Sequence, residues 1–367
     1  MQENYLQGCG INRTCAHQIS TAPYIQSGHF CLFYQTEETP FGTVGRWYLL
    51  DTDNGQREPV PLKPSPCFSE TAFTAGCGKF FFYQDHYPER AFYQYDPAGK
   101  EQALFYSMNQ SLGSFQADGN WMVFVTEPDP GVLNQPEQFQ FLNLKTKEHK
   151  VLTSPNIEPG RLSPERHKNW YVKDGKLFFI AVNDCWNDKE GRSLKGKIAG
   201  YDIEKDEIVA EVSIPEQVQI QQMVYKDNQL WAAGEKNENT GLYCAEIGQD
   251  GQMQEILQIK NDSYDQLVRI QLKENGLFWL KKEMKSLMEN ASSLWWYSLE
   301  KKETVLLMRL EELRALDIEF QVIGNDMYYK DELWKYSFCT PLDAPMTKEK
   351  IGGDGQEEKP KITVKFV

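Results

Sequence analysis

The sequence predicts an all-β protein, a seven-bladed β-propeller with four antiparallel strands in each blade. Three observations lead to this fold class. A unit made of a tight turn, an apolar strand, a loop and a second apolar strand recurs about seven times. Equivalent strands are spaced roughly 42 to 55 residues apart, which is the period of propeller blades rather than of helical solenoids. Aromatic residues form 13% of the chain beside 26 glycines and 18 prolines, and this composition favours strands and turns.

Each unit opens with two residues that suit a tight hairpin turn. Pairs of this kind supply the positive φ angles that such turns require. They are Ser27-Gly28, Cys77-Gly78, Asp118-Gly119, Asp174-Gly175, Asp227-Asn228, Asn275-Gly276 and Gly324-Asn325. We therefore expect a hairpin at each of these positions.

The strand after each turn is apolar on both faces, as expected of a strand buried between two neighbouring sheets. Phe80–Tyr83 and Leu177–Ile180 are examples. A further strand follows in each unit, such as Trp47–Leu50 or Leu294–Tyr297, and the Trp295-Trp296 pair in the latter should place at least one ring in the core. A weaker fourth strand closes the unit. Short helical signals are confined to Lys281–Asn290 and Arg309–Leu316.

The last unit lacks its fourth strand at the usual place. A segment rich in glycine and charge, Met346–Pro360, separates it from Ile362–Phe366, which alternates as a strand does. We expect this C-terminal strand to complete the last blade or to close the ring against the first blade, since an open ring leaves edge strands unpaired. The predicted organisation is an N-terminal extension, residues 1–20, and a single propeller domain, residues 21–367.

Composition and charge exclude several classes of function. The formal net charge is -14, and an acidic surface repels nucleic acids and anionic lipids. No apolar run is long enough to span a membrane. The polar start of the chain predicts a cytoplasmic protein, the alternative being an exported protein whose signal peptide is not in this sequence. The eight cysteines are scattered without a Cys-x-x-Cys pair, so we expect free, buried thiols that bind no metal. We also expect no other metal site, no cofactor and a monomer.

One unit carries a family resemblance. The stretch Gly324–Ser337 combines a Gly-Asn turn, a Tyr-Tyr pair and a Leu-Trp-Lys-Tyr strand. It resembles the repeats of bacterial TolB-like and low-density-lipoprotein-receptor-like propellers. The resemblance implies the fold alone, and it carries over no catalytic motif.

Loop lengths indicate where a ligand would bind. Turns between the first and second strands, and between the third and fourth, are short, whereas those at the opposite end of the blades are long. The long stretches are Gln35–Gly45, Pro61–Glu70, Thr126–Gln138, Thr153–Lys168, Asn183–Gly196 and Lys281–Ser292. Long loops gathered at one end of a rigid scaffold are a common place for binding residues.

Ten residues expected at this end of the blades are candidate ligand contacts. The indole of Trp186, between two aspartates, suits a sugar or a cation, although it also suits packing against the fourth blade. The histidines suit acid–base chemistry or metal binding, although an isolated exposed histidine is more often only solvated. The candidates are Asp85, His86, Arg90, Glu127, Asp129, Arg166, His167, Asp184, Trp186 and Asp188.

Enzyme motifs are absent from the sequence. Asp51–Gly55 resembles a sialidase Asp-box or a calcium loop only in part, because the flanking residues of both motifs are missing, and it reads as a hairpin turn. We therefore expect a non-catalytic binding scaffold that holds a protein, a peptide or a small polar ligand. The alternative is a carbohydrate-active enzyme, a hydrolase or lyase, with its site at the channel mouth, because two suitably spaced carboxylates suffice for such chemistry.

Overall fold

The structure is a computed structural model, and it describes most of the chain between residues 25 and 341. The described residues are 25–40, 42–51, 53–54, 56–60, 62, 73–86, 89–109, 112–126, 138–152, 170–181, 196–248, 251–261, 265–284, 290–310, 318–323, 326–331 and 336–341. All regular elements within these ranges are β-strands. No helix with the length and apolar character of a membrane span occurs among them. The predicted all-β class is confirmed.

The chain divides into two compact units. The first unit combines Met1–Pro61 with Asn261–Val367, and the second unit is Leu62–Lys260. The second unit contains four sheets, which we call blades 2 to 5. The first unit contains two four-stranded sheets, which we call blades 1 and 6, and one three-stranded sheet.

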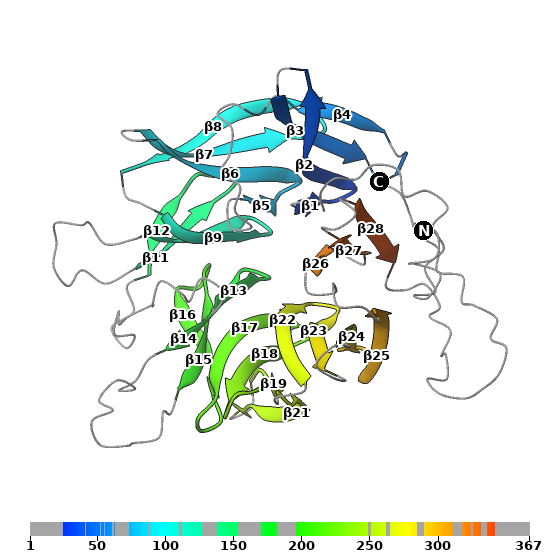
Figure 1. Ribbon diagram of the computed structural model, residues 1–367. Helices are drawn as coiled ribbons and strands as arrows, with labels where there is room; N and C mark the ends of the chain where they lie inside the picture. The colour runs from blue at the N-terminus through cyan, green and yellow to red at the C-terminus, as the bar shows by residue number, and fades with distance from the viewer. Residues whose placement is uncertain are drawn as a thin grey trace. The chain divides into compact units, whose positions relative to one another are not determined.

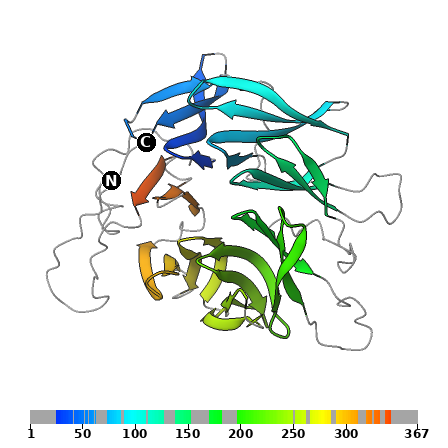
Figure 2. The same cartoon turned by 180° about the vertical axis from the view of Figure 1, so that it is seen from behind.

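The second unit is built from consecutive antiparallel sheets (Figures 1 and 2). Blade 2 consists of β5 (Phe73–Gly76), β6 (Lys79–His86), β7 (Glu89–Asp96) and β8 (Glu101–Met108). Blade 3 consists of β9 (Leu112–Asp118), β10 (Trp121–Thr126), β11 (Gln138–Asn143) and β12 (His149–Val151). Blade 4 consists of β13 (Trp170–Lys173), β14 (Lys176–Ala181), β15 (Lys197–Asp202) and β16 (Glu207–Ser213). Blade 5 consists of β17 (Gln219–Lys226), β18 (Gln229–Lys236), β19 (Asn239–Glu246) and β21 (Gln254–Ile259).

The first unit contains the remaining sheets. Blade 1 consists of β1 (Ile25–Ser27), β2 (Phe30–Thr39), β3 (Gly42–Asp51) and β4 (Arg57–Val60). Blade 6 consists of β22 (Asp265–Lys273), β23 (Gly276–Met284), β24 (Asn290–Ser298) and β25 (Glu303–Leu310). The three-stranded sheet consists of β26 (Ile318–Ile323), β27 (Asp326–Asp331) and β28 (Tyr336–Pro341).

Neighbouring blades of the second unit meet through their first strands. Strand β9 lies against both β5 and β13, and β13 lies against β17. Blades 4 and 5 are also joined at their outer strands. The short strand β20 (Gly251–Gln252) leaves blade 5 and pairs in parallel with β16, and Met253 beside it is buried in the core between these blades.

The core lies between successive sheets and is rich in aromatic side chains. Between blades 2 and 3, Phe92 makes edge-to-face contacts with Phe115 and Phe124. Between blades 3 and 4, Phe141 stacks on Tyr201. Aromatic pairs in these arrangements contribute about 0.5–1.5 kcal/mol beyond the burial of their area. The apolar middle strands that the sequence predicts are therefore the surfaces that hold the blades together.

Tight turns form at, or within one residue of, the predicted pairs that the structure describes, and Gly324-Asn325 lies outside the described residues. In the β5–β6 turn Cys77 and Gly78 have φ angles of 50° and 74°, and in the β13–β14 turn Asp174 and Gly175 have φ angles of 52° and 69°. A second set of turns, after the third strand of several blades, is stabilised by one side chain. The carboxylate of Asp96, for example, accepts hydrogen bonds from the backbone N–H groups of Ala98 and Gly99. Asn143 and Asp202 make equivalent bonds in blades 3 and 4.

The structure corrects the expected number of complete blades. The described residues form six blades of four antiparallel strands each, one of which gains β20 as a fifth strand, whereas we expected seven four-stranded blades. The last sheet has three strands there, and β28 pairs with β27 alone among the described residues. The C-terminal strand expected at Ile362–Phe366 lies outside the described residues.

Two expected loops and one expected helix are also corrected. The expected loop at Gln35–Gly45 is the end of a long hairpin, because β2 and β3 continue their pairing to Thr39 and Gly42. In blade 6, β23 and β24 occupy most of the expected loop at Lys281–Ser292, including residues that we expected to be helical. Paired backbone groups across both strands outweigh the weak local signals there.

Two smaller expectations have different outcomes. Trp296 is buried and Trp295 is partly buried, where it stacks on Trp279, so the packing interpretation of this pair is confirmed. Cys31, Cys77 and Cys244 form no disulfide among the described residues. Cys77 is exposed rather than buried as expected, because it occupies the β5–β6 turn.

Candidate functional site

The lengths of the connections differ between the two ends of the second unit. In an antiparallel blade, the turn between strands one and two and the turn between strands three and four lie at the same end. At that end β9–β10 and β13–β14 are joined by residues 119–120 and 174–175. Three long connections lie at the opposite end. Residues 127–137 join β10 to β11 within blade 3, residues 152–169 join blade 3 to blade 4, and residues 182–196 join β14 to β15 within blade 4. We call this opposite end the long-connection end.

Seven of the ten predicted ligand contacts fall in these three connections. They are Glu127, Asp129, Arg166, His167, Asp184, Trp186 and Asp188, and all lie outside the described residues. Their role therefore stays a prediction. The strands that carry the connections are well defined by their pairing, because Thr126 pairs with Gln138 and Ala181 pairs with Lys197.

The other three predicted contacts lie on blade 2. Asp85 and His86 end β6, and Arg90 lies on β7 directly opposite Asp85 in the register. The hairpin that joins these strands lies at the long-connection end, like the three long connections. The guanidinium of Arg90 donates a hydrogen bond of 3.2 Å to the backbone oxygen of Asn109, just after β8. Arg90 is therefore fixed against the outer edge of its own blade.

A polar network that the sequence did not reveal lies beneath the connection 127–137. The buried amide of Gln140 donates a hydrogen bond of 2.8 Å to the hydroxyl of Thr126, the last residue of β10. Its oxygen lies 2.7 Å from Nε2 of His149 on β12. Burial lowers the pKa of His149, which favours the neutral imidazole. The network therefore fixes the base of the connection. In the sequence, Gln140 is only one polar residue between two aromatic residues of an alternating strand, and nothing there indicates the network.

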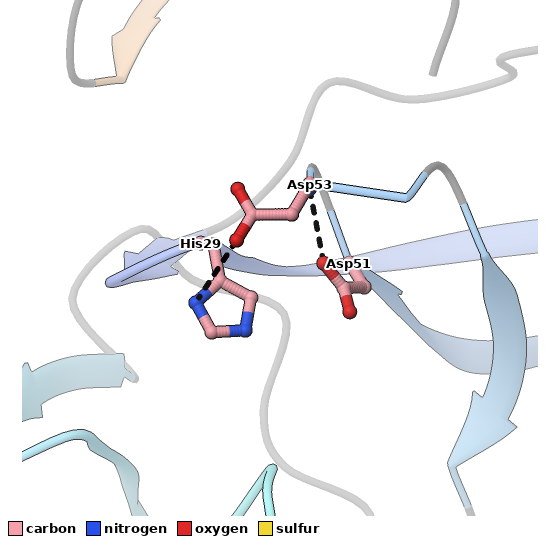
Figure 3. Close-up of side chains that lie close together, drawn as sticks. All are labelled: His29, Asp51 and Asp53. Atoms are coloured by element: carbon pink, nitrogen blue, oxygen red, sulfur yellow. Dashed lines mark hydrogen bonds and ion pairs between the residues drawn. The ribbon is translucent and has the colours of Figure 1, made fainter.

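The first unit contains a second group of polar side chains, at the turn end of blade 1 (Figure 3). His29 lies in the β1–β2 turn, Asp51 ends β3, and Asp53 lies in the β3–β4 turn. Each can offer one donor atom to a metal ion, and these donor atoms all lie within 4.8 Å of one another. Nδ1 of His29 lies 3.8 Å from the nearer carboxylate oxygen of Asp53. An imidazole and two carboxylates therefore converge from two different turns.

Strand pairing explains why these residues meet. Phe30, the first residue of β2, is directly opposite Asp51, the last residue of β3. His29 precedes Phe30 and Asp53 follows Asp51 by two positions, so both side chains lie just beyond the end of the same hairpin ladder. Asp51 is also held in place, because it accepts hydrogen bonds of 3.0 Å from the backbone N–H of Asp53 and 2.8 Å from the side-chain amide of Asn54.

The sequence predicts only part of this group. It predicts a hairpin turn at Asp51–Gly55, and the turn is present. This prediction does not include His29. A signal was available, since both turns belong to the first unit of the repeat and flank strands expected to pair.

Comparison with known proteins shows the fold but no family. No protein-family model matches the chain, and no curated protein matches it significantly in sequence. Solved structures do match. A prolyl endopeptidase has a TM-score of 0.53 at 10% identity over 88% of this chain, and the tricorn protease has a TM-score of 0.51 at 12% identity over 92%. TolB from Acinetobacter baumannii matches 73% of the chain at 14% identity with a TM-score of 0.37.

These comparisons and the repeated four-stranded sheets define the chain as a β-propeller protein. The resemblance to TolB-like propellers that the sequence predicts is one of fold, and TolB is among the solved structures that match. The chain spans 60%, 48% and 34% of the length of TolB, the prolyl endopeptidase and the tricorn protease respectively. Sequence identities this low show the fold alone. The activity of this chain has to be argued from its own residues.

Proposed function

We propose that this protein is a non-catalytic binding β-propeller that holds a protein, a peptide or a small polar ligand at the long-connection end of its second unit. The observation that carries the proposal is the asymmetry of its connections. Blades 3 and 4 use connections of two to five residues at one end, whereas 127–137, 152–169 and 182–196 all emerge at the other. Long connections cost conformational entropy to order, which packing or a bound ligand must offset.

The chemistry of the three connections supports a polar ligand. They contain the seven predicted contacts, which include carboxylates, a guanidinium and an indole. The strands beneath them are buried and paired, so they form a rigid base. The formal net charge of -14 argues against nucleic acid as the ligand. As expected from the sequence, we propose that the protein acts as a monomer.

A loop replacement tests the proposal. Residues 183–195 are replaced by an Asn-Gly turn, which suits a hairpin closed by the pairing of Ala181 with Lys197. The full-length chain and this variant are compared on peptide and oligosaccharide arrays. We expect the wild-type chain to bind a set of array members that the variant does not bind. Equal binding by both would contradict the proposal.

Single substitutions distinguish binding from packing at the same place. Asp184→Ala and Trp186→Ala should weaken binding to the array members while leaving the melting temperature within a few degrees of the wild type. The control is Lys205→Ala, in the exposed β15–β16 turn at the other end of blade 4. If Trp186 instead packs against blade 4, its loss should cost about 3 kcal/mol of stability and leave binding unchanged. Conversion of an oligosaccharide into shorter products would favour the carbohydrate-active enzyme instead.

We also propose that Ile362–Phe366 supplies the strand that the three-stranded sheet lacks, which would make a seventh blade. Three features support this. The sheet β26–β28 follows the same order as the six complete blades, and β28 is its terminal strand. The segment alternates apolar and polar residues. Unpaired strand edges also favour association with another strand.

A further inference from the structure

We propose that His29, Asp51 and Asp53 bind a divalent first-row transition metal ion at the turn end of blade 1. This inference does not rest on the proposed ligand-binding role, because the three residues belong to the first unit. Its basis is the convergence of one imidazole and two carboxylates from two separate turns (Figure 3).

The donor set suits a metal of intermediate hardness. Imidazole nitrogen is a ligand for zinc, iron and nickel, whereas carboxylate oxygen also suits manganese and magnesium. A site with both kinds of ligand favours Mn²⁺ or Zn²⁺ over Ca²⁺, which takes six to eight oxygen ligands. Three protein donors also leave coordination positions for water.

The geometry needs only side-chain rotation to accept an ion. Donor atoms bound to one ion at ~2.1 Å lie ~3 Å apart, and here they already lie within 4.8 Å of one another. The side chains of His29 and Asp53 are 44% and 75% exposed, so both have room to turn toward the ion. Asp51 is less exposed and is held by Asp53 and Asn54, so it provides a fixed ligand.

Comparison of equivalent turns shows that blade 1 differs from other blades in its charges. In blade 2 the turn carboxylate of Asp96 lies 3.5 Å from the ammonium of Lys79. In blade 4 the carboxylate of Asp202 lies 3.7 Å from the ammonium of Lys205.

In the part of blade 1 that the structure describes, no ammonium group lies beside the turn carboxylate. Asp53 adds a second carboxylate beside Asp51, and within the described ranges no lysine or arginine pairs with either of them. Two neighbouring carboxylates repel each other, and a bound dication would offset that repulsion. In blades 2 and 4 a lysine lies beside the turn carboxylate, whereas blade 1 offers a histidine, which is a common metal ligand.

Manganese titration of the full-length chain tests the proposal. Mn²⁺ is the probe because it binds thiolates weakly, so the free cysteines do not compete. Electron paramagnetic resonance measures the free aqueous ion. The variants are His29→Ala and Asp53→Asn, and the matched control is Asp96→Asn, which removes a turn carboxylate in blade 2. We expect one saturable Mn²⁺ site in the wild type and in the control, with affinity at least tenfold weaker in the two variants.

Each remaining outcome contradicts the proposal. A wild-type chain without a saturable site does so directly. Equal loss of affinity in all three variants would mean that Mn²⁺ binds through the overall negative charge of the protein and not at this site. Competition adds a test of the imidazole, since Zn²⁺ should displace Mn²⁺ at lower concentration than Ca²⁺ does, and equal displacement would exclude a nitrogen ligand. Thermal melting of each variant checks that it is folded.

Discussion

The hydroxyl of Thr74 on β5 accepts a hydrogen bond of 2.7 Å from the backbone N–H of Ala117 on β9, so a side chain of blade 2 satisfies the main chain of blade 3. The next junction uses Gln116, whose side chain donates to the backbone oxygen of Trp170 and accepts from the backbone N–H of Val172 on β13. In the first unit, Gln271 on β22 accepts from the backbone N–H of Val322 on β26. Polar side chains on first strands therefore connect neighbouring sheets within each unit.

Substitution of Thr74 tests this connection. Thr74→Val keeps the shape of the side chain but removes the acceptor, so the N–H of Ala117 loses its partner. An unsatisfied buried donor costs about 1–3 kcal/mol, and because this donor is part-buried we expect the free energy of unfolding in urea to fall by about 1 kcal/mol. Thr74→Ser keeps the hydroxyl and is the control. Equal stability of the valine and serine variants would show that the bond contributes nothing.

The pH dependence of stability should reveal the turn role of Asp96. Its pKa is lowered, first by the hydrogen bond from the backbone N–H of Gly99, and also by Ala98 and the charge of Lys79. A lowered folded-state pKa contributes stability that is present above the unfolded-state value of about 3.9 and is lost as pH falls through the folded-state pKa. The wild type should therefore be more stable than Asp96→Asn at neutral pH.

Urea unfolding of both proteins between neutral pH and about pH 3 measures this difference. We expect the advantage of the wild type to shrink as the pH falls below about 4. Asparagine keeps an acceptor oxygen for Ala98 and Gly99, so the comparison isolates the charge. A difference in stability that is constant with pH would contradict this role for the carboxylate.

If the C-terminal strand completes the last sheet, substitutions on its two faces should change the melting temperature differently. Val364 lies on the apolar face of the alternating segment and Lys365 on the other. Val364→Lys should lower the melting temperature, because a buried charge without a partner is costly. Lys365→Gln should leave it unchanged. Differential scanning calorimetry measures both, and equal melting temperatures would mean that the segment does not pair with a buried face.

Part of the turn chemistry was readable in the sequence. Asp174-Gly175 and Cys77-Gly78 mark their hairpins because few residue pairs accept consecutive positive φ angles. The buried strands were readable for a similar reason, since an apolar run such as Trp121–Val125 needs cover on both faces. The expected loop at Gln35–Gly45 shows the limit. Its polar residues gave no strand signal, yet the ladder between β2 and β3 extends through it.

The sequence by itself determined the class of this protein, because turns and apolar strands are local properties that repeat along the chain. It also determined that the long connections leave blades 3 and 4 at one end, since antiparallel order fixes the end at which each connection emerges. Only the tertiary structure brought His29 to Asp51 and Asp53. That meeting depends on the register in which Phe30 opposes Asp51, and a slip of one residue would turn every side chain of the strand to the other face. Register is set by the whole ladder and by packing on both faces, which no single stretch of sequence specifies.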